Sequence, residues 1–166
     1  MSAVVIGIGN EFRRDDGVGP AIVAEVARRG VRVEISDGDP VRLMDAWEDA
    51  DLAVVVDAVR CVPSRPGRLH RANVPTSTSA TSSHGFGVPE AVELARALDR
   101  MPARLVVLAI EVDDVAFGVG LSPLVAGALG PAVDAVLAEL AAVGESPTQD
   151  GRQPPGSGSG GRAPGS

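Results

Sequence analysis

Aromatic side chains and lysine are scarce or missing in this chain. Aromatic residues make up 2% of its 166 residues, and all 15 of its Lys or Arg side chains are arginine. With so few rings the protein has no platform on which nucleic-acid bases could stack, and its formal net charge of −7 disfavours binding to a phosphate backbone. The absence of lysine excludes a lysine Schiff base and the lysine of a Walker phosphate-binding loop. We therefore expect no nucleic-acid partner.

Cysteine and long apolar segments are also scarce. Cys61 is the single cysteine, which excludes an intramolecular disulfide and any zinc or iron–sulfur site built from several cysteines. No apolar run approaches the roughly 20 residues of a membrane span. The first apolar run begins near Ala3 and leaves no room for a signal peptide. These absences predict a soluble, cytoplasmic protein with no membrane partner.

Hydrophobic residues account for 45% of the chain, enough for one sizeable core. Runs rich in Val and Ile at residues 3–8, 31–36, 52–56 and 105–110 alternate little with polar residues, which is typical of strands buried on both faces of a parallel sheet. Residues 67–70 could add an edge strand. Helical spacing of apolar residues occupies residues 20–29, 41–48 and 89–101, and Ser122-Pro123 begins a last helical region that Gly130-Pro131 should kink or divide. The pattern predicts an α/β fold, a three-layer sandwich in which helices flank a mostly parallel, twisted sheet of about five strands.

The end of the chain differs in composition from the rest. From residue 144 to residue 166 it consists of Gly, Pro, Ser and polar residues, with Ala163 as the only apolar side chain. Such a segment cannot offset the entropy lost on ordering. We expect a single α/β domain over residues 1–143, followed by a disordered tail over residues 144–166. No long exposed apolar stripe calls for self-association, so we expect a monomer.

Three polar residues occupy positions where parallel α/β proteins commonly bind ligands. Asp16 follows the first predicted strand, Asp57 directly follows three valines at the end of another, and His84 ends a loop rich in Ser and Thr. Ligands of such proteins bind at the carboxyl ends of the strands. Two carboxylates and an imidazole suit a borderline divalent ion such as nickel, zinc or iron. We therefore interpret the three residues as candidate metal ligands.

Each of these residues also has a simpler interpretation. Asp16 could cap the first helix, Asp57 could be a turn residue, and His84 could be an exposed loop residue. A small-molecule enzyme could use Asp57 or His84 as a base. Cys61 could pair with His84 as a nucleophile, although no adjacent group would activate its thiol.

Two other enzyme classes are disfavoured. Gly7-x-Gly9 imitates the start of a dinucleotide-binding turn, but Phe12 stands at the third glycine position, and the carboxylates of Asp15 and Asp16 would repel a pyrophosphate. No Gly-x-Ser-x-Gly segment occurs, which disfavours a serine hydrolase of the α/β type.

Four segments, in their order and spacing, resemble those of the hydrogenase maturation proteases. They are Gly7-x-Gly9-Asn10 with Asp15-Asp16-Gly17-x-Gly19, then Val56-Asp57-Ala58, then Ser83-His84-x-x-Gly87, and last Gly118-x-Gly120-Leu121-Ser122-Pro123. The resemblance covers residues 4–140. Any one segment is a weak signal, whereas all four in this order are specific.

The resemblance implies an endopeptidase, grouped with aspartic-type peptidases, that removes the C-terminal peptide of a nickel–iron hydrogenase large-subunit precursor after nickel insertion. It implies that Asp16, Asp57 and His84 serve both nickel recognition and catalysis, and that the nickel arrives with the precursor, with no other cofactor. Asp15 and Asn10 would be supporting or turn residues. A non-catalytic nickel-binding chaperone or partner-binding module of hydrogenase assembly would use the same three residues, so this alternative stays open.

Overall fold

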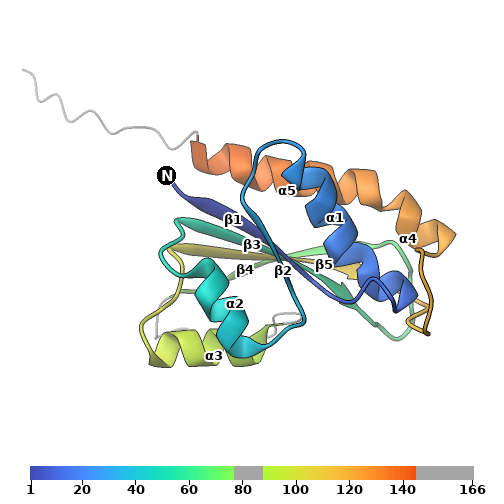
Figure 1. Cartoon of the computed structure of the whole chain (residues 1–166), viewed down its shortest axis with the longest axis horizontal. Coiled ribbons are helices and arrows are strands. Elements are labelled where there is room, and N and C mark those ends of the chain that lie inside the picture. Colours follow the sequence, from blue (N-terminus) through green and yellow to red (C-terminus); the bar gives the residue numbers. More distant parts are fainter. Residues whose placement is uncertain (77–87, 145–166) are drawn as a thin grey trace, which may run out of the picture.

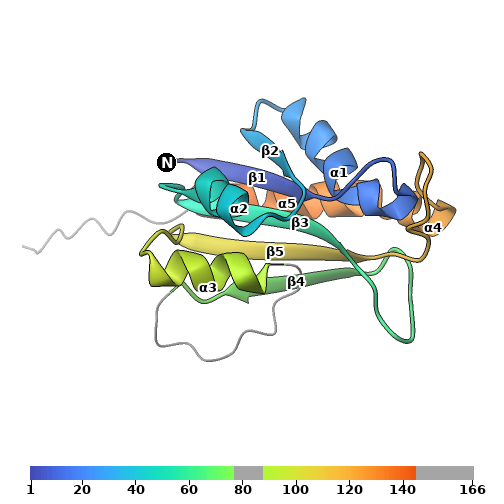
Figure 2. The ribbon, with the colours of Figure 1, turned by 60° about the horizontal axis from the view of Figure 1, so that its bottom comes forward.

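The computed structural model describes residues 1–76 and 88–144, in which a five-stranded sheet lies between two layers of helices (Figures 1 and 2). The strand order is β2-β1-β3-β5-β4. The strands are β1 (Ala3–Ile8), β2 (Val33–Ser36), β3 (Leu52–Val59), β4 (Leu69–Val74) and β5 (Arg104–Glu111). All neighbours pair in parallel except β4, which is antiparallel to β5. The predicted α/β fold class is confirmed.

The helices cover both faces of the sheet (Figure 1). They are a 3₁₀ turn, η1 (Arg14–Gly17), and the helices α1 (Val18–Ala27), α2 (Pro40–Trp47), α3 (Pro89–Ala97), α4 (Pro123–Gly127) and α5 (Leu129–Gly144). The apolar residues of α1 and α5 belong to one core cluster and those of α2 and α3 to another. Each pair of helices therefore packs on its own face of the sheet.

The central strands are buried on both sides, because successive side chains of a strand point to opposite faces. In β3, Val54 and Val56 pack with α1 and α5, whereas Val55 packs with α2 and α3. The same alternation places Asp57 on the face covered by α2 and α3. This two-sided burial explains the continuous apolar runs of the sequence.

Several boundaries differ from the sequence prediction. The strand expected at residues 52–56 continues to Val59, so Asp57 lies within β3 and not after it, and the helix expected at residues 89–101 ends at Ala97. The edge strand expected at residues 67–70 is β4, which runs from Leu69 to Val74 and contains polar residues that hide it from a hydrophobicity pattern. The last helical region is divided as predicted, but at Ala128 and not at Gly130-Pro131. Pro131 lies in the first turn of α5, where its missing N–H has no helical partner to lose.

The region from α4 to α5 is more apolar than the sequence analysis allowed. The 22 residues Pro123–Gly144 are long and apolar enough to cross a membrane by length and composition, and 28% of the apolar 18-residue window within them is buried. The expectation that no segment reaches this length is therefore wrong. Val133 and Val136 of α5 lie in the same core cluster as Val18 and Ile22 of α1, so one side of the helix packs as a core helix does.

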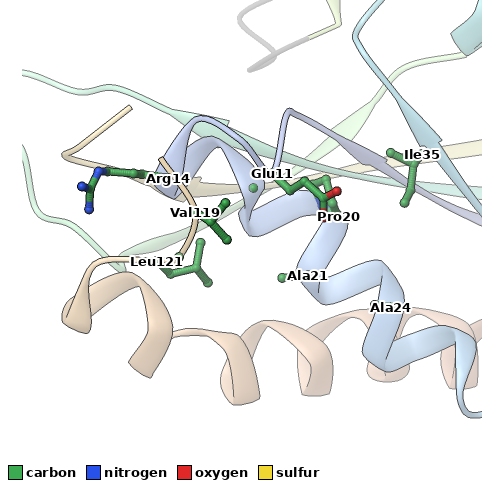
Figure 3. Close-up of a pocket in the computed structure, with 10 residues that line it drawn as sticks. Glu11, Arg14, Pro20, Ala21, Ala24, Ile35, Val119 and Leu121 are labelled. Carbon is green, nitrogen blue, oxygen red and sulfur yellow. The ribbon is translucent and has the colours of Figure 1, made fainter. Parts of the chain in front are cut away.

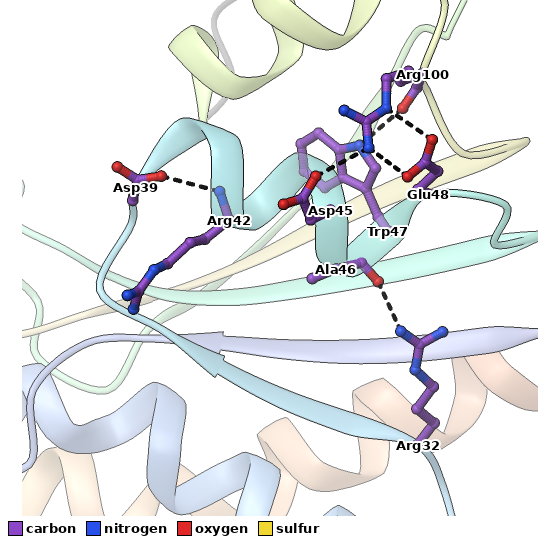
Figure 4. Close-up of polar contacts among 8 residues, drawn as sticks. All are labelled: Arg32, Asp39, Arg42, Asp45, Ala46, Trp47, Glu48 and Arg100. Atoms are coloured by element: carbon purple, nitrogen blue, oxygen red, sulfur yellow. Dashed lines mark hydrogen bonds and ion pairs between the residues drawn. The ribbon is translucent and has the colours of Figure 1, made fainter.

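Side chains fix both ends of α2 (Figure 4). The Asp39 carboxylate accepts a hydrogen bond from a backbone N–H of the first turn and caps the helix. At the other end, the buried indole of Trp47 donates to the carbonyl oxygen of Arg100 at 3.2 Å, and the Arg100 guanidinium pairs with Asp45 and Glu48. Trp47 is the only tryptophan of the chain, so its fluorescence reports on unfolding.

Candidate functional site

Glycines allow the amino end of α1 to lie very close to the ends of β1 and β3. A Cβ atom on Gly19 would lie 2.4 Å from the carbonyl oxygen of Ile8 and 2.9 Å from that of Val56. A Cβ atom on Gly9, whose φ is +144°, would lie 1.9 Å from the carbonyl oxygen of Asp16. These close backbone approaches place Asp16 beside the carboxyl ends of the two central strands.

We expect Gly19→Ala to destabilise the protein by about 2–3 kcal/mol, because the added methyl group would push α1 away from two buried strand ends. The matched control is Gly127→Ala, since a Cβ atom at Gly127 meets nothing within 4 Å. The control should change stability by less than about 1 kcal/mol. Urea unfolding followed by Trp47 fluorescence measures both. Equal midpoints for the two variants would show that the close approach is not required.

Asp16 lies in η1, immediately before α1. Its carboxylate accepts a hydrogen bond from the backbone N–H of Asn10 at 2.9 Å. The N-cap of α1 is Gly17, and within residues 1–76 and 88–144 no side-chain hydrogen bond caps this end of the helix. The interpretation of Asp16 as a helix cap is therefore wrong, and its partly exposed carboxylate faces the turn after β1.

Asp57 lies in β3 and is 9% exposed. Its carboxylate accepts a hydrogen bond from the N–H of the next residue, Ala58, at 2.8 Å. Burial raises the pKa of this carboxyl to about 7, and the negative charge of Asp16 adds to the rise, against the lowering effect of the Ala58 hydrogen bond. The two carboxylates are thus close enough to repel each other. A bound cation would relieve this repulsion, which is what a metal-binding pair requires.

Asp15 is fully buried inside the protein, unlike the adjacent, partly exposed Asp16. Its carboxylate accepts hydrogen bonds from the backbone N–H groups of Asp113, Asp114 and Ser122 and from the Ser122 hydroxyl. Burial raises the pKa of Asp15, but these hydrogen bonds outweigh it and bring the pKa below its ordinary value. Asp15 therefore joins the β1–α1 segment to the β5–α4 segment.

The Ser-Pro pattern predicted that the Ser122 hydroxyl caps α4, and the structure shows that it does not. Ser122 does stand at the N-cap position with Pro123 behind it, but its side chain makes no capping hydrogen bond. The hydroxyl donates to Asp15 at 2.8 Å instead. Asn10 is a turn residue as expected, because its side-chain oxygen accepts from the backbone N–H of Phe12 at 3.0 Å.

The third predicted ligand, His84, lies outside the described residues. Its part in the site therefore stays a prediction, and so does the alternative in which it pairs with Cys61. The thiol of Cys61 contacts Glu111, and burial together with this carboxylate raises its pKa. A raised pKa is the opposite of what a cysteine nucleophile needs.

The sequence analysis missed a group of side chains near Cys61. One ligand atom each of Cys61, His70 and Glu111 lie within 4.8 Å of one another. The strand ends at residues 59 and 111 could have suggested that Cys61 and Glu111 meet, but the position of His70 depends on the antiparallel register of β4.

A groove lies between α1 and the segment that precedes α4 (Figure 3). Its lining includes Glu11, Arg14, Pro20, Ile35, Val119 and Leu121. The two bordering loops run side by side, since the N–H of Gly118 donates to the Phe12 carbonyl at 2.9 Å. Phe12, Phe117 and Val119 are 61%, 89% and 76% exposed. Large exposed apolar side chains gathered in this way are typical of a protein-binding surface.

Comparison with known proteins places these features in one family. The family model described as HycI, "Hydrogenase maturation protease", matches residues 20–139, a span that includes the positions of Asp57 and His84. The chain belongs to the hydrogenase maturation protease family. The family relationship supports a peptidase that acts in hydrogenase maturation.

Individual relatives agree with this assignment. The chain is 28% identical to the hydrogenase 2 maturation protease of Escherichia coli K12, over 84% of this chain and 91% of the relative. It is 34% identical to the hydrogenase expression/formation protein HupD of Bradyrhizobium diazoefficiens, over 83% of this chain and 77% of the relative. The solved structure of the hydrogenase maturating endopeptidase HybD from E. coli superposes with a TM-score of 0.70 at 25% identity, over 87% of this chain and 94% of that one.

Proposed function

We propose that this protein is an endopeptidase that removes the C-terminal peptide of a nickel–iron hydrogenase large-subunit precursor after nickel has been inserted. The observation that carries the proposal is that Asp16 and Asp57, whose negative charges interact, both lie toward the carboxyl edge of the sheet in a member of a maturation protease family. The exposed apolar side chains beside the groove suit a protein substrate.

Asp16 and Asp57, together with His84, would bind the nickel that the precursor carries. In this scheme the metal is part of the substrate, and the protein recognises it as a sign that insertion is complete. The donor set suits the ion, because nickel accepts both carboxylate and imidazole ligands. A precursor without nickel would supply no cation to relieve the repulsion between the Asp16 and Asp57 carboxylates of this protein.

Two routes to hydrolysis are compatible with this arrangement. The nickel could polarise the scissile carbonyl or activate a water molecule as a Lewis acid. Alternatively, Asp57 could remove a proton from water, since a pKa of about 7 lies near the operating pH at which a general base is most effective. The second route would justify grouping the protein with aspartic-type peptidases. We propose further that the protein acts as a cytoplasmic monomer.

The test is a processing assay read by mass spectrometry. The purified protein is incubated with nickel-loaded and with nickel-free large-subunit precursor from the same organism. We expect a C-terminal peptide to be released from the loaded form alone. Binding of the loaded precursor without peptide release would instead establish the nickel-binding chaperone, and cleavage of both forms would contradict recognition of the metal.

A further inference from the structure

Three side chains that can bind a metal meet at the ends of three strands, apart from Asp16 and Asp57. Cys61 follows the end of β3, His70 lies in β4, and Glu111 is the last residue of β5. They meet because β5 lies between the other two strands, with Glu111 paired to Val59 and Ala109 paired to His70. The meeting point is thus fixed by the register of the sheet and not by a flexible loop alone.

The carboxylate of Glu111 is held in place on several sides. Its side chain is 2% exposed. One oxygen accepts a hydrogen bond from the backbone N–H of Arg65 at 3.1 Å, while the other lies 2.8 Å from His70 Nε2 and 4.0 Å from the guanidinium of Arg68. The orientation of the carboxylate is therefore fixed before any ligand arrives, as is usual around metal sites. Cys61 and His70 are only partly buried, so the group can be reached from solvent.

We propose that Cys61, His70 and Glu111 bind a zinc ion at a second metal site. A thiolate, an imidazole and a carboxylate are all common zinc ligands, and three protein ligands leave a fourth tetrahedral position for water. In such a site the ligand atoms lie roughly 3–4 Å apart. The ligand atoms of this group already lie within 4.8 Å of one another, so small side-chain rotations suffice.

Binding would exchange a proton for the metal. The Cys61 thiol releases its proton to solvent as the zinc–sulfur bond forms, and a thiolate and a carboxylate together neutralise the two positive charges of the ion. Zinc would take the place of the contact between His70 and Glu111. It would join the loop that follows β3 to β4 and to the end of β5.

This site is separate from the one proposed for nickel. Across the sheet, Asp57 is paired with Ala109 and Ala109 with His70, so His70 lies two strands from Asp57 on the same face. Asp57 and Asp16 provide only carboxylates, whereas the second site includes the single thiol of the chain. A thiol makes the second site softer and favours zinc over ions that prefer oxygen.

The test uses cobalt as a spectroscopic substitute for zinc in the purified full-length protein, stripped of metal with a chelator. We expect one equivalent of Co²⁺ to produce a thiolate-to-cobalt charge-transfer band that zinc abolishes. Because the chain has one cysteine, the band reports Cys61 alone. Cys61→Ser should lose the band, His70→Gln should weaken binding at least about tenfold, and Asp57→Asn should leave the band unchanged.

Trp47 fluorescence would confirm that each variant is folded. The proposal would be overturned if no thiolate band formed at stoichiometric cobalt, or if His70→Gln bound the metal as tightly as the wild-type protein. No precursor is present in this experiment, so its outcome is independent of the proposed peptidase function.

Discussion

Asp57→Asn is expected to reduce precursor processing by about a hundredfold or more and, at the same time, to make the protein more stable at about pH 8. Burial and the charge of Asp16 raise the pKa of Asp57 to about 7 in the folded protein, well above the value of an exposed aspartate. The folded state therefore holds this proton more tightly than the unfolded state does. Ionising Asp57 costs folding free energy, and this cost grows as the pH rises from about 4 through about 7. Asparagine carries no charge and avoids the cost.

The size of the stability gain expected for Asp57→Asn follows from how far the pKa of Asp57 is raised on folding. Each unit of pKa difference corresponds to about 1.4 kcal/mol, so the gain for Asp57→Asn should reach about 2–4 kcal/mol above neutral pH and should shrink toward about pH 4. Urea unfolding at several pH values, read by Trp47 fluorescence, measures it. Asp134→Asn is the control, since Asp134 is exposed on α5 and should change stability by no more than about 0.5 kcal/mol at any pH.

Two outcomes would contradict this interpretation of Asp57. If the Asp57→Asn variant processed the precursor at the wild-type rate, Asp57 would have no role in nickel recognition or catalysis. A gain in stability that did not depend on pH would show that burial and the charge of Asp16 do not raise the pKa of Asp57.

Asp15→Ala is expected to produce the largest loss of stability among these substitutions, about 3–6 kcal/mol. The change removes the buried acceptor of four hydrogen bonds and leaves the backbone N–H groups of Asp113, Asp114 and Ser122, which lie in partly buried hydrogen bonds, without this partner. Each lost hydrogen bond to this charged carboxylate costs about 1–2 kcal/mol, since the donors lie only partly buried and water can satisfy them in part. The β1–α1 and β5–α4 segments would then depend on their other contacts, such as the backbone hydrogen bond from the Gly118 N–H to the Phe12 carbonyl, and Asp16 would be held less firmly.

Ser122→Ala is the matched control for Asp15→Ala. It removes the hydroxyl hydrogen bond and keeps the backbone one, so the expected loss is about 1 kcal/mol. Because the folded pKa of Asp15 is lowered, its contribution is present above the ordinary pKa of an aspartate and is lost as the pH falls below that range. The stability difference between wild type and Asp15→Ala should therefore narrow in acid. A difference below about 1 kcal/mol at neutral pH would show that the four hydrogen bonds are not what joins the two segments.

The sequence was sufficient for the parts of the fold that depend on burial. The runs that became β1, β3 and β5 are apolar because helices cover both of their sides, and this property is visible residue by residue. The rule that ligands bind at the carboxyl ends of parallel strands singles out Asp16 and Asp57 as candidates at one edge of the sheet. Parallel pairing of β1 with β3 brings the turn that follows β1 to the same edge as the end of β3.

Features that depend on register or on side-chain choice could not be predicted in the same way. His70 meets Glu111, 41 positions away in the chain, only because β4 runs antiparallel to β5 in one particular register. The Ser122 hydroxyl could form a hydrogen bond either with the first turn of α4 or with the carboxylate of Asp15. The local sequence favours the first, whereas the structure shows the second. The division into residues 1–143 and a tail over residues 144–166 stays a prediction, as does the role of His84.

The nickel environment in the enzyme–precursor complex is the most direct test of the proposed site. X-ray absorption at the nickel edge would be recorded for a cleavage-resistant, nickel-loaded precursor, alone and bound to this protein. The proposed function predicts that binding adds oxygen or nitrogen ligands to the nickel, and that Asp16→Asn or Asp57→Asn reduces this change. A nickel environment that is identical in the free and bound precursor would contradict direct recognition of the metal by these carboxylates.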